Sequence, residues 1–401
     1  MTSLPLAGVR VLECASVIAG PYCSYLLTLL GAETIKIERP ITGDWMRSQG
    51  GDDALNAAGL GSMFLSCNAG KRSVTLNLKD PRGVQIAREL ASRADVMIEN
   101  WRPGTAARLG VGYDDIRKVN PRIVYCSISG FGQDGPMSPR AAYDHIVQAV
   151  SGIMSVTGTP ETAPSRTGPP MVDYLTGLAA ALAVLAGLRE RDRNGQAQHL
   201  DVGMLDCAVA AMGSIISAQV NGGIAAAPIG NAAASGAPSS GLFQTGTTPL
   251  TMVANTEDQF AALCRALGRP DLVADPRFCD PVLRKQNQDV LRAIIGAVLA
   301  ERPAVDWELA LAAEGVPAGA VRSVAEVLDE AQVATRELFR RLPLPAQDRD
   351  AAFPTAGFKL NGRSIGPERG APILGADNDA VLSELGYDAA KRQALRRDGV
   401  G

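Results

Sequence analysis

The sequence predicts an α/β protein with two parts: a larger, Rossmann-like domain built on a parallel sheet, and a smaller α/β domain. Strand and helix patterns alternate from residue 8 to residue 130, and long helical patterns then continue to residue 221. A second alternating stretch begins at residue 242, after a glycine-rich segment. Strand–helix–strand alternation is typical of a parallel sheet with helices on both faces. A chain of 401 residues is long enough to bury two hydrophobic cores.

The first 130 residues contain most of the predicted sheet. Apolar and β-branched runs predict strands at 9–15, 33–38, 95–100 and 122–130, and helical periodicity predicts helices at 20–31 and 81–94, with helical turns up to 120. Ligands of a parallel sheet bind at the carboxyl ends of its strands. The loops that follow Cys14, Glu38 and Glu99 are therefore predicted to line the site.

The rest of the chain is predicted to complete the large domain and to form the small one. Helical patterns occupy 143–153, 174–190 and 204–221, with a strand at 197–204. Residues 222–241 are small and glycine-rich, which is typical of a linker or an active-site loop. A small domain is predicted at 242–325, with a strand at 251–255 and helices at 256–268, 286–301 and 304–314. Residues 326–401 are predicted to return to the large domain formed by 1–221 and to end in one helix at 378–398.

Composition narrows the class of protein. The 39 basic and 42 acidic residues are mixed along the chain, so no basic block indicates a nucleic acid or an anionic membrane as partner. The first residues lack the pattern of a secretory signal, and the apolar helical pattern at 175–188 is short for a bilayer. Seven scattered cysteines indicate reduced thiols, and two histidines exclude a multi-histidine metal centre. We expect a cytoplasmic protein without a metal.

The segment PPMVDYLTGL, at 169–178, presents one acid at the head of a long apolar helix. Two prolines stiffen the approach to this helix, and Asp173 occupies the position at which an N-cap is expected. Free backbone N–H groups and the helix dipole would keep its carboxylate ionised, as a nucleophile requires. The alternative for this segment alone is ordinary helix capping.

Other residues of the predicted loops suggest an anion site. The first loop has no G-x-G-x-x-G motif, so hydride chemistry on NAD has little support, but the helix that starts at Gly20-Pro21 leaves N–H groups available to an anion. Basic residues recur near the ends of the predicted strands, and guanidinium groups suit phosphate: Lys36, Arg39, Lys71, Arg72, Lys79, Arg102, Arg108 and Arg140. Each one alone could be a solvated surface charge.

Each of the two histidines could be catalytic or structural. His145 follows Tyr143 and Asp144 in a helical pattern, and His199 lies in a predicted strand. Either could serve as a general base, but a packed or surface role is the usual one for a single histidine. Asp173 is the best nucleophile in the sequence.

Together these segments carry a resemblance. The motifs are LAGVRVLE, AGPY, LGAETIKIERP, GDWMR, NAGKRSVTLNLKDPRG, ADVMIENWRPG, LGVGYDDI, NPRIVYCSISGFGQDGP, AYDHIVQAVSG, DYLTGL and LGADNDAVLSELGY. In this order the chain resembles the class III CoA-transferases, the family that includes formyl-CoA transferase and the α-methylacyl-CoA racemases. The resemblance implies an interlocked, ring-like homodimer that exchanges CoA between acids without a metal.

The resemblance also assigns residues. Asp173 matches the catalytic aspartate of the family. The positions that match its CoA contacts are Val17, Ile18, Ala19, Arg39, Leu76, Asn77, Leu78, Lys79, Asn100, Trp101, Arg102, Arg108, Arg140, Ala141, Ala142 and Tyr143. Ala234, Ser235 and Gly236 match its active-site loop, which in formyl-CoA transferases is a glycine run. That departure argues against oxalate and formate as the substrates.

The implied chemistry starts with the attack of Asp173 on an acyl-CoA and continues through mixed anhydrides and an aspartyl-CoA thioester. Succinyl-CoA is the expected donor, and itaconate, mesaconate, malate or glutarate the expected acceptor. Arg47 or Arg166 could bind the free carboxylate of such an acid. A racemase of the same family is the alternative, although Tyr143 stands where a racemase has its histidine. A noncatalytic nucleotide-binding protein would have no use for Asp173.

Overall fold

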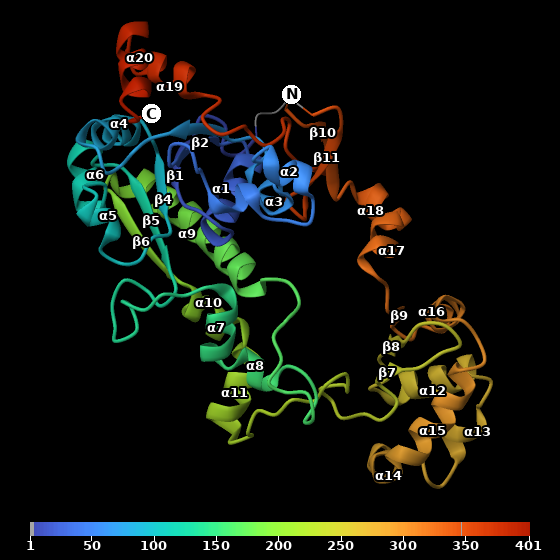
Figure 1. Ribbon diagram of the computed structural model, residues 1–401. Coiled ribbons are helices and arrows are strands. Elements are labelled where there is room, and N and C mark those ends of the chain that lie inside the picture. Colours follow the sequence, from blue (N-terminus) through green and yellow to red (C-terminus); the bar gives the residue numbers. More distant parts are fainter. Residues whose placement is uncertain (1–3, 346) are drawn as a thin grey trace. The chain divides into compact units, whose positions relative to one another are not determined.

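The computed structural model describes residues 4–345 and 347–401. The chain divides into two compact units, each of which we describe by itself (Figure 1). The first unit comprises Met1–Ile153, Arg166–Gly223 and Ala334–Gly401, and the second comprises Met154–Ser165 and Ile224–Val333. The division of the chain into functional domains, as predicted from the sequence, stays a prediction.

The first unit is built on a six-stranded sheet in the order β3-β2-β1-β4-β5-β6. Each strand pairs in parallel with its neighbour. The strands are β1 (Arg10–Cys14), β2 (Glu33–Glu38), β3 (Arg72–Thr75), β4 (Val96–Glu99), β5 (Val124–Ser129) and β6 (Gln198–Gly203). The predicted α/β class with a parallel sheet is confirmed. The sequence analysis missed β3, because this strand has only four residues and begins with a charge.

Helices cover both faces of this sheet (Figure 1). On one face, α4 (Pro81–Ser92), α6 (Tyr113–Val119), α19 (Asn378–Glu384) and α20 (Ala389–Arg397) contribute to a core with Leu12, Met97 and Tyr125. On the other, α1 (Ala19–Leu29) and α9 (Met171–Asn194) pack on Val11, Ile98 and Val124. Side chains alternate between the two faces along each strand, which is why Val11 and Leu12 enter different cores.

Two predicted helices differ from the structure. The C-terminal helix predicted at 378–398 is two helices, α19 and α20, because Gly386 breaks it with a φ of +93°. The apolar helix at the middle of the chain is longer than predicted: α9 has 24 residues. By length and composition alone α9 could cross a bilayer, and half of its most apolar window is buried inside the structure. Packing against α1 and the sheet accounts for that buried half.

Shorter helices fill the remaining connections of the first unit. They are η1 (Trp45–Ser48), α2 (Asp53–Ala57), α3 (Ser62–Asn68), α5 (Thr105–Arg108), α7 (Asp144–Ser151), α10 (Met204–Ala211) and α11 (Gly213–Gly222). The tail adds two antiparallel pairs, β10 (Phe339–Pro343) with β11 (Asp350–Pro354) and β12 (Lys359–Leu360) with β13 (Arg363–Ser364). The helix α18 (Ala331–Arg336) is divided between the two units at Ala334. Another short helix, α8 (Ile153–Val156), lies at the division between the units.

The second unit has its own three-stranded antiparallel sheet, β7 (Gly241–Phe243), β8 (Leu250–Met252) and β9 (Ala318–Ala320). Its helices are α12 (Glu257–Ala266), α13 (Asp271–Ala274), α14 (Pro281–Gln286), α15 (Gln288–Leu299), α16 (Ala304–Ala313) and α17 (Val324–Asp329). Phe260, Leu263 and Trp307 lie in its core. A separate hydrophobic core of this kind allows a unit to fold as a compact body.

Candidate active site

The carboxyl edge of the large sheet contains a switch point. The strand order reverses between β1 and β4, so the loops that follow Cys14 and Glu99 leave the sheet side by side and in opposite directions. Asn100 joins them: its Oδ1 accepts the Ser16 N–H at 2.9 Å and its Nδ2 donates to the Ser16 carbonyl at 2.7 Å. This is the edge at which the sequence predicted the site.

The loop after β1 is held in an uncommon conformation. Val17 has a φ of +71°, which is costly for a β-branched residue. Its N–H donates to Oδ1 of Asp44 at 3.2 Å, and Asp44 also pairs with Lys36 at 3.0 Å. Strained loop residues of this kind cluster at functional sites.

The first turns of α1 and α9 lie against each other at this edge. A Cβ on Gly177 would come within 2.8 Å of the Ala19 carbonyl oxygen, so only glycine allows this approach. The rings of Tyr22 and Tyr174 meet edge to face, with centroids 4.9 Å apart. Both helices lead back to strands of the sheet, so both begin at its carboxyl edge. The predicted nucleophile, one residue before Tyr174, therefore lies at the same edge as the switch-point loops.

The prediction that Asp173 is the N-cap of its helix was wrong. The helix begins at Met171 with Pro170 at the N-cap, so Asp173 is its third residue and lies in the first turn. The cap comes from another helix: Oδ2 of Asp144 accepts the N–H groups of Val172 at 2.8 Å and of Asp173 at 3.1 Å. The helix starts three residues earlier than predicted, directly after the double proline, and proline has no side-chain acceptor with which to cap it.

The electrostatic prediction for Asp173 was also wrong in direction. Asp173 is 8% exposed and Asp144 7%. Burial, and second the charge of Asp144, raise the pKa of Asp173 from 3.8 to about 7. A carboxyl group with a pKa near 7 exists in both its acid and its ionised form at neutral pH. Perturbed acids of this kind are typical of catalytic positions.

The residues predicted to contact CoA emerge from loops at the same edge, with different exposures. The cationic and aromatic side chains at or near the loop ends are exposed: Arg39, Lys79, Arg102, Arg108, Arg140 and Tyr143. Ala141 is exposed as well, and Val17, Asn77, Leu78, Asn100, Trp101 and Ala142 are half-buried. Ile18, Ala19 and Leu76 are buried, and Leu76 packs in the core beneath α4. The topology thus brings the predicted contacts to one edge, and the long basic side chains face solvent there.

Three cations that the sequence analysis assigned to ligand binding are structural instead. Lys36 and Lys71 are buried and pair with Glu13 at 2.6 Å and 2.7 Å. Arg47 forms two hydrogen bonds of 2.7 Å with Glu38, so it cannot bind the free carboxylate of a substrate. For one of these pairs the two residues belong to predicted strands, since Glu13 and Lys36 lie opposite each other in the register of β1 and β2.

Arg72 and Arg166 have different surroundings. Arg72 pairs with Glu384 at 2.7 Å, so it too is engaged within the protein. Arg166 is exposed in the segment before α9. Arg166 is therefore the remaining arginine of the two suggested for the free carboxylate.

The predicted active-site loop belongs to the second unit. Ser235 donates to Oδ1 of Asn255 at 2.8 Å, and Ser240 donates to the same oxygen at 2.8 Å. Gly236 has a φ of +69°, which a side chain rarely adopts. Ala234, directly before Ser235, is exposed. The N–H of Gly236 donates to the Ala233 carbonyl at 2.9 Å, so this part of the loop is held in a turn.

The histidines occupy separate places. His145 is exposed on α7, with its ring parallel to that of Tyr143 at 6.3 Å. His199 hydrogen-bonds with Ser127 at 3.1 Å and stacks on Tyr113 at 4.5 Å. Neither histidine contacts Asp173 in these arrangements, as a second base acting together with it would. Within 4–345 and 347–401, no group of three or more His, Cys, Asp or Glu side chains could hold a metal ion.

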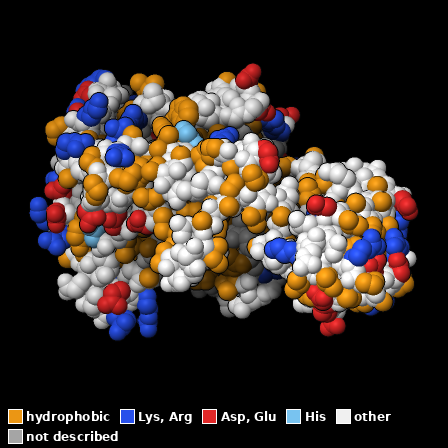
Figure 2. Space-filling model, turned by 90° about the horizontal axis from the view of Figure 1, so that it is seen from below, with side chains coloured by type: hydrophobic (Ala, Val, Ile, Leu, Met, Phe, Trp, Pro, Cys, Tyr) orange, Lys and Arg blue, Asp and Glu red, His pale blue; other side chains and the backbone are white. Residues whose placement is uncertain are grey.

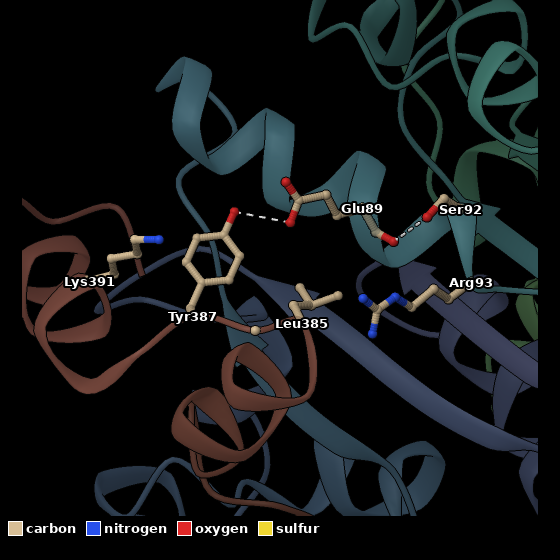
Figure 3. Close-up of a pocket in the computed structure, with 7 residues that line it drawn as sticks. Glu89, Ser92, Arg93, Leu385, Tyr387 and Lys391 are labelled. Carbon is tan, nitrogen blue, oxygen red and sulfur yellow. Dashed lines mark hydrogen bonds between the residues drawn. The ribbon is translucent and has the colours of Figure 1, made fainter.

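A cavity of about 450 Å³ lies at the other end of the sheet, between α4 and the C-terminal tail (Figure 3). Its lining comprises Glu89, Ser92, Arg93, Leu385, Gly386, Tyr387 and Lys391. Tyr387 donates to Glu89 at 3.0 Å, and Arg93 donates to the Glu384 carbonyl at 2.7 Å, so these polar groups are already engaged. Because α4 ends three residues before β4 begins, this cavity is at the amino edge, and we assign the site to the carboxyl edge.

Sequence comparison decides the family. The sequence model of CoA-transferase family III matches residues 6–378. The chain belongs to this family. It is therefore an enzyme, a family III CoA-transferase, as the resemblance in its motifs predicted.

Named relatives and a solved structure agree with this assignment. The chain is 38% identical to the mouse succinyl-CoA:glutarate CoA-transferase, over 99% of this chain and 90% of the relative. It is 37% identical to the acetyl-CoA:oxalate CoA-transferase of Acetobacter aceti, over 96% and 97% of the two chains. A CaiB/BaiF family protein from Brucella suis superposes with a TM-score of 0.85 and 29% identity, over 96% of this chain and all (100%) of the other. The fold and the transferase class are therefore shared along nearly the whole chain.

Proposed function

We propose that this transferase moves CoA from succinyl-CoA, or another dicarboxylyl-CoA, to a carboxylic acid such as glutarate, malate, mesaconate or itaconate, with Asp173 as the nucleophile. The observation that carries the proposal is the buried carboxyl of Asp173, with a pKa of about 7, at the carboxyl edge of the sheet. The name of the mouse relative supports succinate and glutarate as the acids. The name of the Acetobacter relative keeps acetyl-CoA and oxalate among the substrates to be tested.

The proposed reaction is a series of acyl exchanges on Asp173. A carboxylate oxygen attacks the thioester carbonyl of the donor, the C–S bond breaks, and a mixed anhydride and CoA thiolate form. The thiolate attacks the aspartyl carbonyl, releases the donor acid and leaves an aspartyl-CoA thioester. The carboxylate of the acceptor attacks this thioester, and the thiolate then attacks the acceptor carbonyl, which regenerates Asp173. No proton is transferred in these steps, so only the ionised form of Asp173 reacts.

The surroundings of Asp173 suit these steps. The loop from Val17 to Ala19, in which only Val17 is partly exposed, and the loop from Asn100 to Arg102 flank the switch point, where a ligand of such a sheet binds. Arg39 and Arg108 are exposed and available to the phosphates of CoA. A racemase would need a second base, and Tyr143 occupies the position of its histidine.

We also propose that the enzyme works in the cytoplasm as the interlocked homodimer that its motifs imply. Apolar side chains are exposed on the face shown in Figure 2. The helices α9 and α11 leave large ones uncovered, with Leu182 70% and Val220 75% exposed. Apolar surface of this kind is typical of an interface between subunits. Light scattering on the purified protein should give twice the mass of the chain, 41.9 kDa.

The test of the catalytic proposal compares two aspartates on α9. We expect Asp173→Ala to lower turnover by at least roughly 10³-fold, because it removes the nucleophile of every step. Asp192→Ala, at the exposed end of the same helix, should keep the wild-type rate. Donors should include succinyl-CoA and acetyl-CoA, and acceptors should include glutarate, malate, mesaconate, itaconate and oxalate. New CoA esters are followed by mass spectrometry.

Two further observations complete this test. Hydroxylamine added with acyl-CoA should modify Asp173 in the wild-type enzyme, because it attacks the aspartyl thioester. Incubation of a chiral 2-methylacyl-CoA in deuterated water should leave the α hydrogen in place. Full turnover by Asp173→Ala, or deuterium uptake without any acyl exchange across the panel, would reject the proposal.

A further inference from the structure

We propose that Asp144 is a positioning residue for catalysis: by capping α9 from a neighbouring helix, it holds the turn that presents the Asp173 carboxylate to the thioester. The inference rests on the proposed role of Asp173 as the nucleophile. Asp144 itself exchanges no atom with the substrate. Its role is to fix the backbone of Asp173 and to set the charge beside it.

The contacts of Asp144 join three segments. Oδ2 accepts the N–H groups of Val172 and Asp173, as described above, and Oδ1 accepts from Nε2 of Gln148 at 2.6 Å. Oε1 of Gln148 in turn accepts the N–H of Thr167 at 3.0 Å. Gln148 is 1% exposed, so this chain of hydrogen bonds is shielded from water. The bonds connect α7, the segment that leads into α9, and the first turn of α9.

A cap of this kind is unusual because the helix does not supply it. A helix normally begins with its own Ser, Thr, Asp or Asn, and here Pro170 holds that position without a side-chain acceptor. The cap lies 28 residues earlier in the chain, directly after Tyr143, which matches a CoA contact of the family. The same short segment therefore carries a predicted CoA contact and the group that holds the nucleophile. Binding of CoA and placement of Asp173 are linked through it.

Asp144 also sets the electrostatic environment of Asp173. The charged or ionisable groups on α7, α10 and β6, which pack against α9, include Asp144, His145, Asp206, His199 and Asp201; α1 and β5 carry no Asp, Glu, Lys, Arg or His. Within the described residues, Asp144 is the charged group that raises the pKa of Asp173. Removing its charge should therefore lower that pKa and ionise Asp173 at a lower pH. A residue that only holds the fold together would not move the pH dependence of the reaction.

The experiment uses the full-length enzyme and the variant Asp144→Asn, which removes the charge and replaces one of the two acceptor oxygens with an N–H₂ donor. The side chain can then no longer accept both from Gln148 and from the N–H groups of α9, so the first turn loses part of its support. We expect kcat to fall roughly 10²-fold, the loss typical of a small misplacement of reacting groups, with KM for the CoA ester changed less than about threefold. The acid limb of kcat/KM, which reports the free enzyme, should move to lower pH. Unfolding temperature and light scattering confirm that the variant folds and assembles.

Two companion variants separate position from charge. Gln148→Met breaks the bond to Oδ1 of Asp144 without changing any charge, so it should lower kcat and leave the acid limb in place. Asp144→Glu keeps the charge with a longer side chain and should also lower kcat without moving the limb. If Asp144→Asn does not fold, Asp144→Glu becomes the test of position. A wild-type kcat in Asp144→Glu would then overturn the inference.

The outcomes distinguish this inference from the proposed function. If Asp173→Ala is inactive but Asp144→Asn has wild-type kcat and an unmoved acid limb, Asp144 has no positioning role and the nucleophile assignment stands. If Asp173→Ala keeps full turnover, the proposed function fails first, and the inference fails with it. A lower kcat together with a shifted limb in Asp144→Asn, and an unshifted limb in Gln148→Met, supports it.

Discussion

Two buried carboxyl groups of the large unit, those of Glu13 and Asp173, have opposite acid–base behaviour. Burial would raise the pKa of Glu13, but the ammonium groups of Lys36 and Lys71 overcome this effect and lower it to about 2. Burial also raises the pKa of Asp173, and there the neighbouring charge is a second carboxylate, so the pKa reaches about 7. The difference between them lies in the sign of the nearest charge, not in the depth of burial.

A buried carboxylate with a cationic partner supports the fold, and one without such a partner is available for chemistry. Glu13 accepts from Lys36 and from Ser24 of α1, each at 2.6 Å, and ties β1, β2 and α1 together. No cation partners Asp173 in the part of the chain that the structure describes, so its carboxylate remains free to attack a carbonyl carbon. A nucleophile has to be left without such a partner, and the protein stabilises the turn around it instead.

The largest effect on stability is expected from breaking the paired region. Glu13→Gln would leave the ammonium groups of Lys36 and Lys71 buried without their shared carboxylate, which typically costs about 3–5 kcal/mol. Glu190→Gln, whose side chain is 47% exposed and pairs with Arg193, should cost less than about 1 kcal/mol. Urea unfolding measures both. Equal losses in the two variants would mean that Glu13 is not the centre of a buried network.

The opposite effect is expected at Asp173. Because its pKa is raised in the folded state, the proton that it keeps stabilises the fold at low pH, and this stability is lost as the pH rises from the unfolded value of 3.8 through about 7. Asp173→Asn does not titrate, so it should be more stable than the wild type above pH 7, by up to about 4 kcal/mol at 1.36 kcal/mol per pKa unit.

The check is the free energy of unfolding of both proteins at several pH values between 4 and 8. The difference in favour of Asp173→Asn should be smallest near pH 4 and should grow with pH. A difference that stays constant over this range would show that Asp173 has an ordinary pKa.

A smaller effect is expected at the exposed cations, which differ from buried Lys36 and Lys71. Arg39→Ala and Arg108→Ala should each weaken CoA-ester binding by about 1.5–3 kcal/mol, the range for hydrogen bonds to charged groups, and raise KM with little change in kcat. Arg117→Ala, an arginine with a 56% exposed side chain on α6, is the matched control. Steady-state kinetics with the best CoA ester measure both KM values. A KM that stays at the wild-type value in both variants would mean that CoA binds elsewhere.

Much of the architecture could be predicted because it depends on local patterns. The strands β1, β2 and β4 were predicted at 9–15, 33–38 and 95–100, and each ends in the structure within one residue of the predicted end, because apolar runs end there and turn residues follow. The class of enzyme was also predictable, since a succession of short motifs carries it. The short strand β3 was missed because its sequence is partly polar. The helix predicted at 378–398 was too long, because Gly386 breaks it.

The sequence by itself determined the parallel α/β sheet, the family and the acid at the head of α9. Only the tertiary structure decided the environment of Asp173. Asp144, 29 residues earlier, caps its helix, and burial beside a like charge reverses the expected direction of the pKa shift of Asp173. Only the tertiary structure, too, turned Lys36, Lys71 and Arg47 from ligand-binding candidates into buried partners of Glu13 and Glu38. The physical reason is the same in both cases, because the energy of a charge depends on the solvent and charges that surround it in space, and folding brings these together from distant parts of the chain.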